Sequence, residues 1–392
     1  MKRRSFIQTS VAGLAGIGAL GASASGSRLF GMSKRPADNK TFITRKLGKT
    51  GIVLPVVSMG VMNSNSADLV RAALDAGLIF LDTANGYQRG TNETMIGQVL
   101  AGRPRDSYVI ATKVPGVPRD RKTGLFSPET SAETFLTMFD TSLKRLNLAY
   151  VDILYLHNVL QRESVIFEPL LQALLKVKKE GKARFIGVST HGNEHEVIRA
   201  VLEAKVHDVV LTGYNFRKNN LAELDAAIAD AVKAGIGIVA MKTLAGGYWD
   251  EERQRPINVK AALKWALNNP HITTAIPGMT TFDQLKADVE VARDITLTPQ
   301  EIKDLKPETA TGGLYCQQCS RCLPQCRQGL PIPSLMRGYM YAYGYRNMDL
   351  AKDVVAETGL SKDPCGSCRT CAVTCAMRFD IKSRVTSVSA LA

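Results

Sequence analysis

Short runs rich in Val, Ile and Leu alternate with longer segments of helical periodicity from about residue 44 to residue 295. Apolar β-branched runs are typical of buried strands, and apolar positions three and four residues apart are typical of amphipathic helices. The helical periodicity is clear over Ser131–Leu146, Glu168–Lys179, Leu221–Ala234 and Val259–Leu267. The predicted strands are Val56–Gly60, Ile79–Thr83, Tyr108–Lys113, Val151–His157, Arg184–Ser189, Asp208–Tyr214, Gly237–Lys242 and Ile272–Pro277.

Eight strands separated by helices over about 250 residues are the expected content of a (β/α)8 barrel. A doubly wound open sheet is the alternative, but no G-x-G-x-x-G motif follows the first predicted strand, and this favours the barrel. The turn glycines between Arg45 and Ile52 predict a small hairpin before it. The sequence therefore predicts an α/β protein, a TIM barrel over residues 44–295, with a smaller module after it.

Polar residues end three consecutive predicted strands, where the chemistry of such barrels takes place. Asp82 ends the second strand, Lys113 the third and His157 the fourth, and the loop after Asp82 carries Tyr87. Singly, each has an ordinary structural explanation as a turn cap, a solvated lysine, a core histidine or a loop aromatic. Together they predict a proton-transfer site in which Lys113 lowers the pKa of Tyr87. Asp82 would keep Lys113 charged, and His157 would orient a carbonyl group.

Several motifs around these positions resemble the aldo-keto reductase family. The chain reads FLDTA over residues 80–84, ATK over 111–113, LH over 156–157, GKARFIGVS over 181–189 and IPG over 276–278. Glu93 and Gly97 follow Tyr87 at the family's spacing. The resemblance covers roughly residues 44–295. It implies that Tyr87 is the proton donor, that a small carbonyl or alcohol is the substrate, and that NADP or NAD supplies hydride at the barrel mouth.

The positions that would contact this cofactor depart from the family pattern. Thr190 follows Ser189 where the family usually has Asn, Leu211 replaces a common Gln, and Met241 replaces a frequent aromatic. Cations that would hold a 2′-phosphate are absent at Gly278 and Gln284, which leaves NADP and NAD both open. Lys242 would reach the pyrophosphate or would be a surface lysine. The predicted cofactor contacts are Ser189, Thr190, Met241, Lys242, Gly278 and Gln284.

All eight cysteines lie in two C-x2-C-x2-C-x3-C runs, within a module predicted over residues 311–385. This is the bacterial ferredoxin spacing, in which the fourth cysteine of each run binds the other cluster. Zinc is an alternative, but structural zinc pairs two C-x2-C elements. Disulfides are another, but four thiols within eleven residues make poor partners. We predict two [4Fe–4S] clusters, one on Cys316, Cys319, Cys322 and Cys375 and one on Cys365, Cys368, Cys371 and Cys326.

The segment Ile332–Gly344 between the runs has Met and Tyr at helical spacing and predicts a helix that packs the clusters against the barrel. The module as a whole is predicted to be ferredoxin-like and mostly helical. The chain thereby resembles the subgroup of aldo-keto reductases with a C-terminal iron–sulfur extension.

Residues 1–27 carry a basic start with Arg3-Arg4, an uncharged apolar stretch and a small-residue site near Ala24. This pattern predicts a twin-arginine signal peptide, recognition by the twin-arginine translocase and a periplasmic location. That route exports folded proteins, which suits clusters assembled in the reducing cytoplasm. No later apolar segment is long enough to span a membrane.

The net charge of +14 is spread along the chain without a run of five Lys or Arg, so we expect no nucleic-acid partner. Three functions stay open: an exported oxidoreductase with electron-transferring clusters, an electron-transfer protein whose barrel docks a redox partner protein, and a reductase with structural clusters.

Overall fold

The computed structural model describes residues 41–120, 122–306 and 313–391. A short antiparallel hairpin precedes the barrel, as predicted, with β1 (Thr44–Lys46) paired to β2 (Val53–Pro55) around the 3-10 turn η1 (Gly48–Thr50). Gly48 has φ +51° there, and a Cβ on it would lie 2.4 Å from the carbonyl oxygen of Gly235. Only glycine lets the hairpin approach the barrel this closely. The predicted signal peptide lies outside the described residues.

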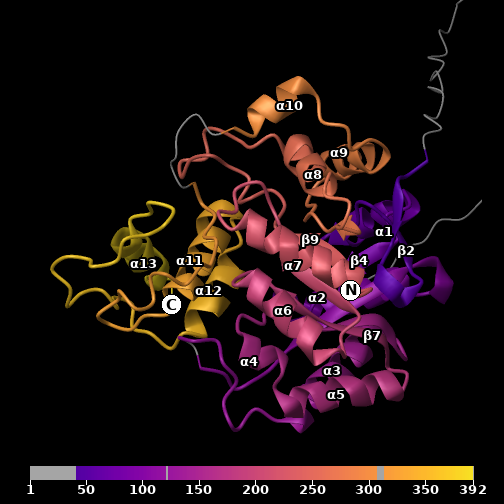
Figure 1. The fold of residues 1–392 in the computed structure, drawn as a ribbon, viewed down its shortest axis with the longest axis horizontal. Helices are drawn as coiled ribbons and strands as arrows, with labels where there is room; N and C mark the ends of the chain where they lie inside the picture. Colours follow the sequence, from indigo (N-terminus) through magenta and orange to yellow (C-terminus); the bar gives the residue numbers. More distant parts are fainter. Residues whose placement is uncertain (1–40, 121, 307–312, 392) are drawn as a thin grey trace, which may run out of the picture. The chain divides into compact units, whose positions relative to one another are not determined.

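The eight predicted strands form one parallel sheet, ordered β10-β9-β8-β7-β6-β5-β4-β3. Parallel bridges from Val57 to Ala275 and from Gly60 to Gly278 bring its two edges together, and helices surround it (Figure 1). The (β/α)8 prediction is confirmed. The strands are β3 (Met59–Gly60), β4 (Phe80–Asp82), β5 (Val109–Pro115), β6 (Val151–His157), β7 (Ala183–Thr190), β8 (Val209–Gly213), β9 (Gly237–Met241) and β10 (Thr274–Ala275).

Strand lengths differ from the prediction in two ways. β5 continues to Pro115, so Lys113 lies inside that strand rather than at its end. The first and last strands are each two residues long, because bridges rather than a continuous ladder join them.

The barrel helices follow the predicted periodicity closely. The Ser131 hydroxyl accepts the Thr134 N–H to start α3, and Asn147, at φ 53°, ends that helix. The helices between β3 and residue 306 are α1 (Ala67–Asp75), α2 (Thr91–Leu100), α3 (Ala132–Leu146), α4 (Arg162–Val165), α5 (Glu168–Lys179), α6 (Glu194–Ala204), α7 (Leu221–Lys233), α8 (Val259–Leu267), α9 (Phe282–Arg293) and α10 (Pro299–Asp304), with 3-10 turns η2 (Tyr87–Gly90) and η3 (Arg105–Ser107).

The barrel interior is a packed core. Alternate residues of neighbouring strands point inward, among them Phe80 of β4, Ala111 of β5 and Tyr155 of β6. Leu47 and Leu54 of the hairpin join this cluster and close the N-terminal end of the barrel. The interior is therefore open to chemistry only at the carboxyl ends of the strands.

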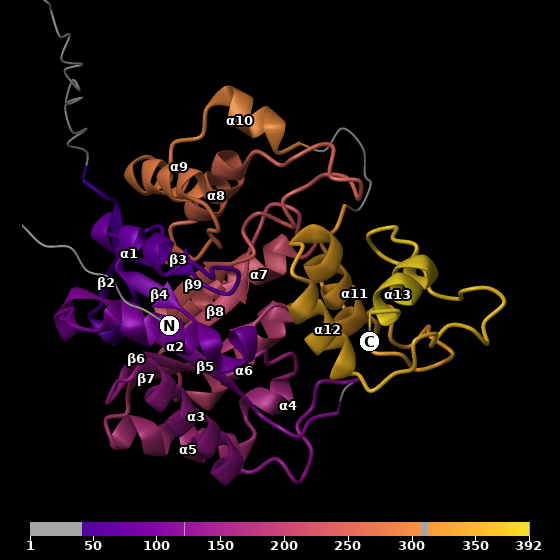
Figure 2. The ribbon, with the colours of Figure 1, turned by 180° about the vertical axis from the view of Figure 1, so that it is seen from behind.

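The regular secondary structure of the described C-terminal segment is helical, and the rest of the segment is loop. It contains α11 (Ile332–Tyr339), the π-helical turn η4 (Met340–Gly344), α12 (Met348–Ala356) and α13 (Ile381–Ser389), and the cysteine runs occupy the loops between them. α11 packs between α12 and α13, where a Cβ on Gly338 would lie 3.2 Å from Val355 and 3.4 Å from Val388 (Figure 2). Within the described residues, no helix has both the length and the apolar character needed to cross a membrane.

One apolar cluster joins this segment to the barrel. Tyr315, Met340 and Tyr341 bury against Ile257 and Ala261 beside α8. Arg384 of α13 donates to Glu251 at 2.6 Å, and the Tyr339 hydroxyl bonds the same carboxylate. The η4 turn is thus held beside the loops that follow the barrel strands.

Candidate active site

Strand register brings three of the predicted residues together. Asp82 lies opposite Ala111 in the β4–β5 ladder, so Lys113, two residues further on, points to the same inner side of the sheet. His157 lies two residues beyond the inward-facing Tyr155 in β6. These side chains extend the inward rows of the barrel interior to its mouth.

Lys113 is the centre of this group. Its ammonium group donates to Asp82 Oδ1 at 2.5 Å, to the carbonyl oxygen of Thr83 at 2.6 Å and to the Tyr87 hydroxyl at 3.2 Å. Its side chain is 1% exposed. Burial lowers the pKa of Lys113, but the charge of Asp82 and the contact with Tyr87 outweigh this and raise it. Lys113 is therefore charged and donates three hydrogen bonds.

The turn η2 positions Tyr87. Gln88 and Arg89, which follow it, have φ of 50° and 53°, an uncommon backbone for residues other than glycine. Arg89 donates to Asp353 of α12 at 2.7 Å, which ties the turn to the C-terminal segment. The Tyr87 and His157 rings meet edge to face with centroids 6.1 Å apart. Strain held by neighbouring contacts is common at functional sites.

The expected lowering of the pKa of Tyr87 is wrong. Burial raises this pKa more than Lys113 lowers it, and Asp82 and Tyr341 raise it further. Tyr87 is therefore a protonated phenol at neutral pH that accepts from Lys113 and has its own proton to donate.

His157 is held neutral. Burial lowers its pKa well below 6.5, and the cations Lys113, Arg119, Arg337 and Lys242 lower it further. A neutral imidazole can donate one hydrogen bond and accept another without adding a charge. The four side chains Asp82, Tyr87, Lys113 and His157, hereafter the proton-transfer set, can hold a polar group and move a proton to it.

The predicted cofactor contacts are not all in one place. The Ser189 hydroxyl accepts the Asn158 N–H at 3.0 Å, and the Thr190 hydroxyl donates to the Gly192 carbonyl at 2.9 Å. Both residues end β7, and their hydroxyl groups are already hydrogen-bonded to the loops that follow β6 and β7.

The other four predicted contacts divide between two regions. Met241 ends β9, and Lys242 follows it at φ 57° with its ammonium 5.5 Å from the centre of the Tyr341 ring. Gly278 and Gln284 are exposed near the start of α9, where Gln284 Oε1 accepts the Thr280 N–H at 2.7 Å. Lys242 is half-buried and lines a cavity, which favours a role facing the barrel mouth over the alternative of a surface lysine.

The structure adds residues that sequence reasoning missed. With its amide oxygen turned toward the nearest donors, Asn158 accepts from Arg119 at 3.2 Å and from Arg337 at 3.1 Å and donates to His191 at 3.1 Å. Arg337 and Tyr341 come from α11 and η4, more than 170 residues after His157. No spacing rule relates such distant positions. The one signal was Asn158 itself, directly after the predicted His157.

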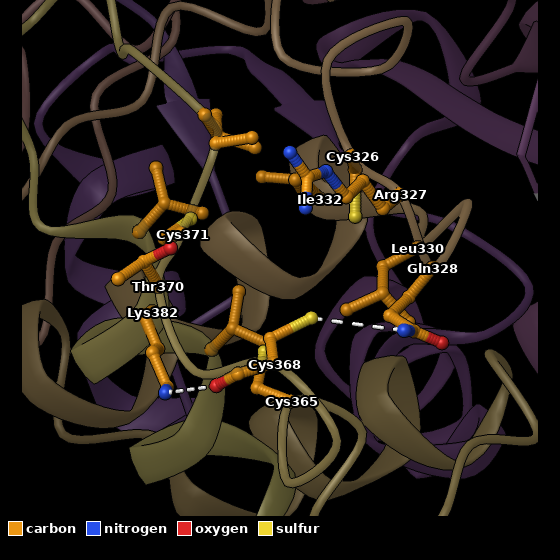
Figure 3. Close-up of a pocket in the computed structure, with 14 residues that line it drawn as sticks. Cys326, Arg327, Gln328, Leu330, Ile332, Cys365, Cys368, Thr370, Cys371 and Lys382 are labelled. Carbon is orange, nitrogen blue, oxygen red and sulfur yellow. Dashed lines mark hydrogen bonds between the residues drawn. The ribbon is translucent and has the colours of Figure 1, made fainter.

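Three cysteines of the second run line a pocket together with Cys326, the fourth cysteine of the first run. Its wall includes Cys326, Cys365, Cys368 and Cys371 (Figure 3). Gln328 donates to the Cys368 sulfur at 3.6 Å, and Lys382 donates to the Cys368 carbonyl at 2.6 Å. These four thiols are one of the two sets predicted from the ferredoxin spacing.

The other four thiols also influence one another. Burial raises the pKa of Cys316 to about 12, and Cys322, Cys319 and Cys375 contribute to the increase. The cysteines form no disulfide. Among the described residues, no three His, Cys, Asp or Glu side chains are close enough to share one metal ion. A four-iron cluster makes a different demand, because each of its four cysteines binds a different iron.

The chain matches known proteins over its barrel. Residues 57–261 match the Aldo/keto reductase family. L-glyceraldehyde 3-phosphate reductase of Escherichia coli strain K12 is 25% identical over 334 residues, which are 70% of this chain and 95% of that protein. L-galactose dehydrogenase of Arabidopsis thaliana is 28% identical over 291 residues, 64% of this chain and 88% of the relative.

Solved structures show the same fold. An aldo-keto reductase of Bacillus halodurans has a TM-score of 0.54 at 23% identity and covers 68% of this chain and 95% of its own. One of Klebsiella pneumoniae, solved in complex with NADPH, has a TM-score of 0.54 at 22% identity and covers 68% of this chain and 94% of its own. The family match extends over more than half of the sequence and includes all four members of the proton-transfer set. The chain therefore belongs to the aldo/keto reductase family and is an oxidoreductase.

Proposed function

We propose that the protein interconverts a small carbonyl compound and its alcohol with a nicotinamide cofactor at the barrel mouth. The observation that carries this proposal is the Lys113–Tyr87 contact of 3.2 Å, with the His157 ring edge to face with the tyrosine. Names of relatives as a reductase and a dehydrogenase support the reaction class, and the NADPH complex of the Klebsiella relative supports the cofactor. A bound nicotinamide would supply or accept a hydride.

The chain's own residues divide the remaining work. In reduction the Tyr87 hydroxyl gives its proton to the carbonyl oxygen, and the hydrogen bond from Lys113 stabilises the phenolate that is left. Asp82 keeps Lys113 charged and fixed. Neutral His157 donates to the same carbonyl oxygen and orients it. Alcohol oxidation uses these groups in reverse.

We further propose that the eight cysteines hold two [4Fe–4S] clusters with crossed ligation. The pocket that joins Cys326 to Cys365, Cys368 and Cys371 supports this assignment, since the fourth cysteine of one run lies with the first three of the other. Amide N–H groups of Gln318 and Met377 point at Cys316 and Cys375 at 3.4 Å, contacts that stabilise thiolate ligands. Bound clusters of this kind exchange single electrons.

One observation favours electron transfer over a purely structural role. Cys316 lines the same small cavity as His191 and Lys242, which lie at the carboxyl ends of the barrel strands. A cluster on Cys316 would therefore adjoin the barrel mouth, and the pocket of Cys365, at the far end of the cysteine loops, would be the site for a redox partner. Export by the twin-arginine route to the periplasm completes the proposal and has its support in residues 1–27 alone.

The Tyr87→Phe variant tests the reaction. Loss of the proton donor should lower kcat by about a thousandfold or more, while iron content and nicotinamide binding stay unchanged. Tyr150→Phe, on the loop before β6, is the matched control and should keep full activity. Undiminished turnover by Tyr87→Phe would remove the assignment.

Paired cysteine variants test the ligand sets. Each variant should leave about four of about eight irons per chain, and EPR spectra should show that Cys326→Ala loses the same cluster as Cys365→Ala, and Cys375→Ala the same cluster as Cys316→Ala. Proton transfer at Tyr87 would be unaffected by either assignment. Loss of the same cluster by Cys326→Ala and Cys316→Ala would contradict crossed ligation.

A further inference from the structure

Three cations at the barrel mouth have no carboxylate partner. In the part of the chain that the structure describes, no ion pair joins Arg119, Arg337 or Lys242 to an acidic side chain. The buried lysines at this end of the barrel are paired, Lys113 with Asp82 and Lys218 with Glu194. Arg337 is buried, and Arg119 and Lys242 are half-buried. Removing a charge from water without a counter-ion is costly, so this unpaired group requires an explanation.

The three cations converge on one place. The Arg119 and Arg337 guanidinium groups both lie within 3.2 Å of the Asn158 side-chain oxygen, and each lowers the pKa of His157. Arg337 and Lys242, together with His191, line one small cavity. The carboxylate of Glu357 acts to raise the pKa of Arg119, but Glu357 is exposed and the two side chains form no ion pair.

Asn158 and Lys242 are held by a backbone conformation that is unfavourable for residues other than glycine. Asn158 directly follows β6 and Lys242 directly follows β9, and both have left-handed backbone, with φ of 58° and 57°. A lysine gains nothing locally from this conformation, which costs about 1 kcal/mol or more. Its effect is to turn the ammonium inward, over the Tyr341 ring and into the cavity.

We propose that Arg119, Arg337 and Lys242 form a recognition site for an oxyanion, a carboxylate or a phosphate, carried by the carbonyl substrate beside His157. Two arginine forks are the donors that match such a group. Burial and the neighbouring cations Arg337 and Lys218 lower the pKa of Lys242 to about 7, so an anion beside it would favour its charged form. This inference rests on the proposed carbonyl–alcohol function. It selects 2-oxo acids, aldose phosphates or their alcohols over neutral carbonyl compounds.

Arg337 brings the C-terminal segment into this site. It lies on α11, which packs between α12 and α13, so the barrel alone would supply only Arg119 and Lys242. The C-terminal segment then contributes to substrate choice as well as carrying the cysteines. A different explanation is that the cations only balance the charge of a cluster on Cys316, which lines the same cavity.

Calorimetry on the full-length iron-loaded protein separates these explanations. The probes are inorganic phosphate and malonate, titrated into wild type, Arg337→Gln, Arg119→Gln and Arg346→Gln. Arg346 is exposed and near the same helix, so its variant controls for loss of one positive charge. We expect saturable one-to-one binding, weakened about tenfold to a hundredfold in the two site variants and unchanged in the control. Arg337→Lys, which keeps the charge, should recover part of the affinity even if Arg337→Gln folds poorly.

Turnover then distinguishes the two anion sources. A 2-oxo acid is compared with its methyl ester, and an aldose phosphate with the free aldose. In the site variants kcat/KM should fall about a hundredfold for the charged member and less than about threefold for the neutral one. Preference for one charged family identifies carboxylate or phosphate as the natural group.

Four results would count against the inference. Turnover of neutral carbonyls without anion binding would overturn it and leave the proposed function intact. Anion binding abolished by NADPH in direct competition would assign the site to the cofactor phosphates instead. A shifted cluster potential in Arg337→Gln with unchanged anion affinity would make the cations counter-charges. Anion binding by a protein with no nicotinamide-dependent turnover would uphold the anion site, overturn its assignment to substrate and remove the proposed function.

Discussion

At the barrel mouth, Lys113 is fixed by three protein oxygens supplied by neighbouring strands and turns. In the cysteine loops, by contrast, Cys319 and Cys371 are exposed and Cys368 has one side-chain donor at 3.6 Å. The first site is built mainly by the strands and the turns that follow them, through buried hydrogen bonds. The second has thiols on irregular backbone with few contacts among themselves.

This difference indicates how each site depends on its ligand. A site made by register and buried hydrogen bonds persists whether or not a substrate is present. Loops whose ligand residues come from two distant runs gain their order from what they bind, since binding energy then contributes to folding. Changes in the proton-transfer set should therefore follow the stability of the barrel, and the order of the cysteine loops should depend on the proposed clusters.

Lys113→Met should give the largest effect on the barrel side. Asp82 would be left buried without its partner, so kcat should fall by about a thousandfold or more and stability by about 3–5 kcal/mol. Steady-state kinetics and urea unfolding measure the two effects. Lys218→Met breaks the other buried lysine–carboxylate pair and should lose similar stability with a much smaller change in kcat. Equal losses of kcat in both variants would mean that Lys113 acts only structurally.

Iron removal should separate the two regions. Anaerobic chelation should abolish amide-exchange protection in residues 313–331 and 357–380, while the strands keep theirs. Hydrogen exchange with mass spectrometry resolves these segments. Loss of protection throughout the barrel would show that the two regions fold as one unit and that the barrel site also depends on iron.

The pH dependence of stability should reveal the neutral histidine. Because the pKa of His157 is well below 6.5 in the folded protein, the unfolded chain takes up a proton near pH 6.5 that the folded chain refuses. Stability should therefore decrease as pH falls below 6.5, and His157→Gln should reduce that slope. Urea midpoints between pH 5 and pH 8 provide the measurement. An unchanged slope in the variant would show that His157 is charged or solvated.

The smallest effect is expected at the contact between the two regions. Arg89→Gln and Asp353→Asn each remove the ion pair that ties the Tyr87 turn to α12. Exposed pairs contribute little, so stability should barely change and kcat should fall about twofold, equally in the single and double variants. A large additive loss would mean that α12 positions Tyr87 more strongly than the pair implies.

Sequence periodicity predicted the eight strands in order because a parallel barrel strand is buried on both faces and must be apolar throughout. The alternation of inward-facing side chains along β4 and β6, which ends at Asp82 and His157, also follows from the local two-residue period of a strand. The pKa of Tyr87 was expected in the wrong direction because burial, which no motif records, outweighs Lys113.

By itself, the sequence determined what depends on spacing: the barrel, the proton-transfer set and the two cysteine runs. Only the tertiary structure decided that Arg337 and Tyr341 lie at the barrel mouth, that Lys242 faces a cavity, and that Cys326 lies with the second run. The physical reason is the separation along the chain over which each effect acts. Periodicity and register act over a few residues, whereas burial and charge proximity depend on segments that meet after the chain has folded.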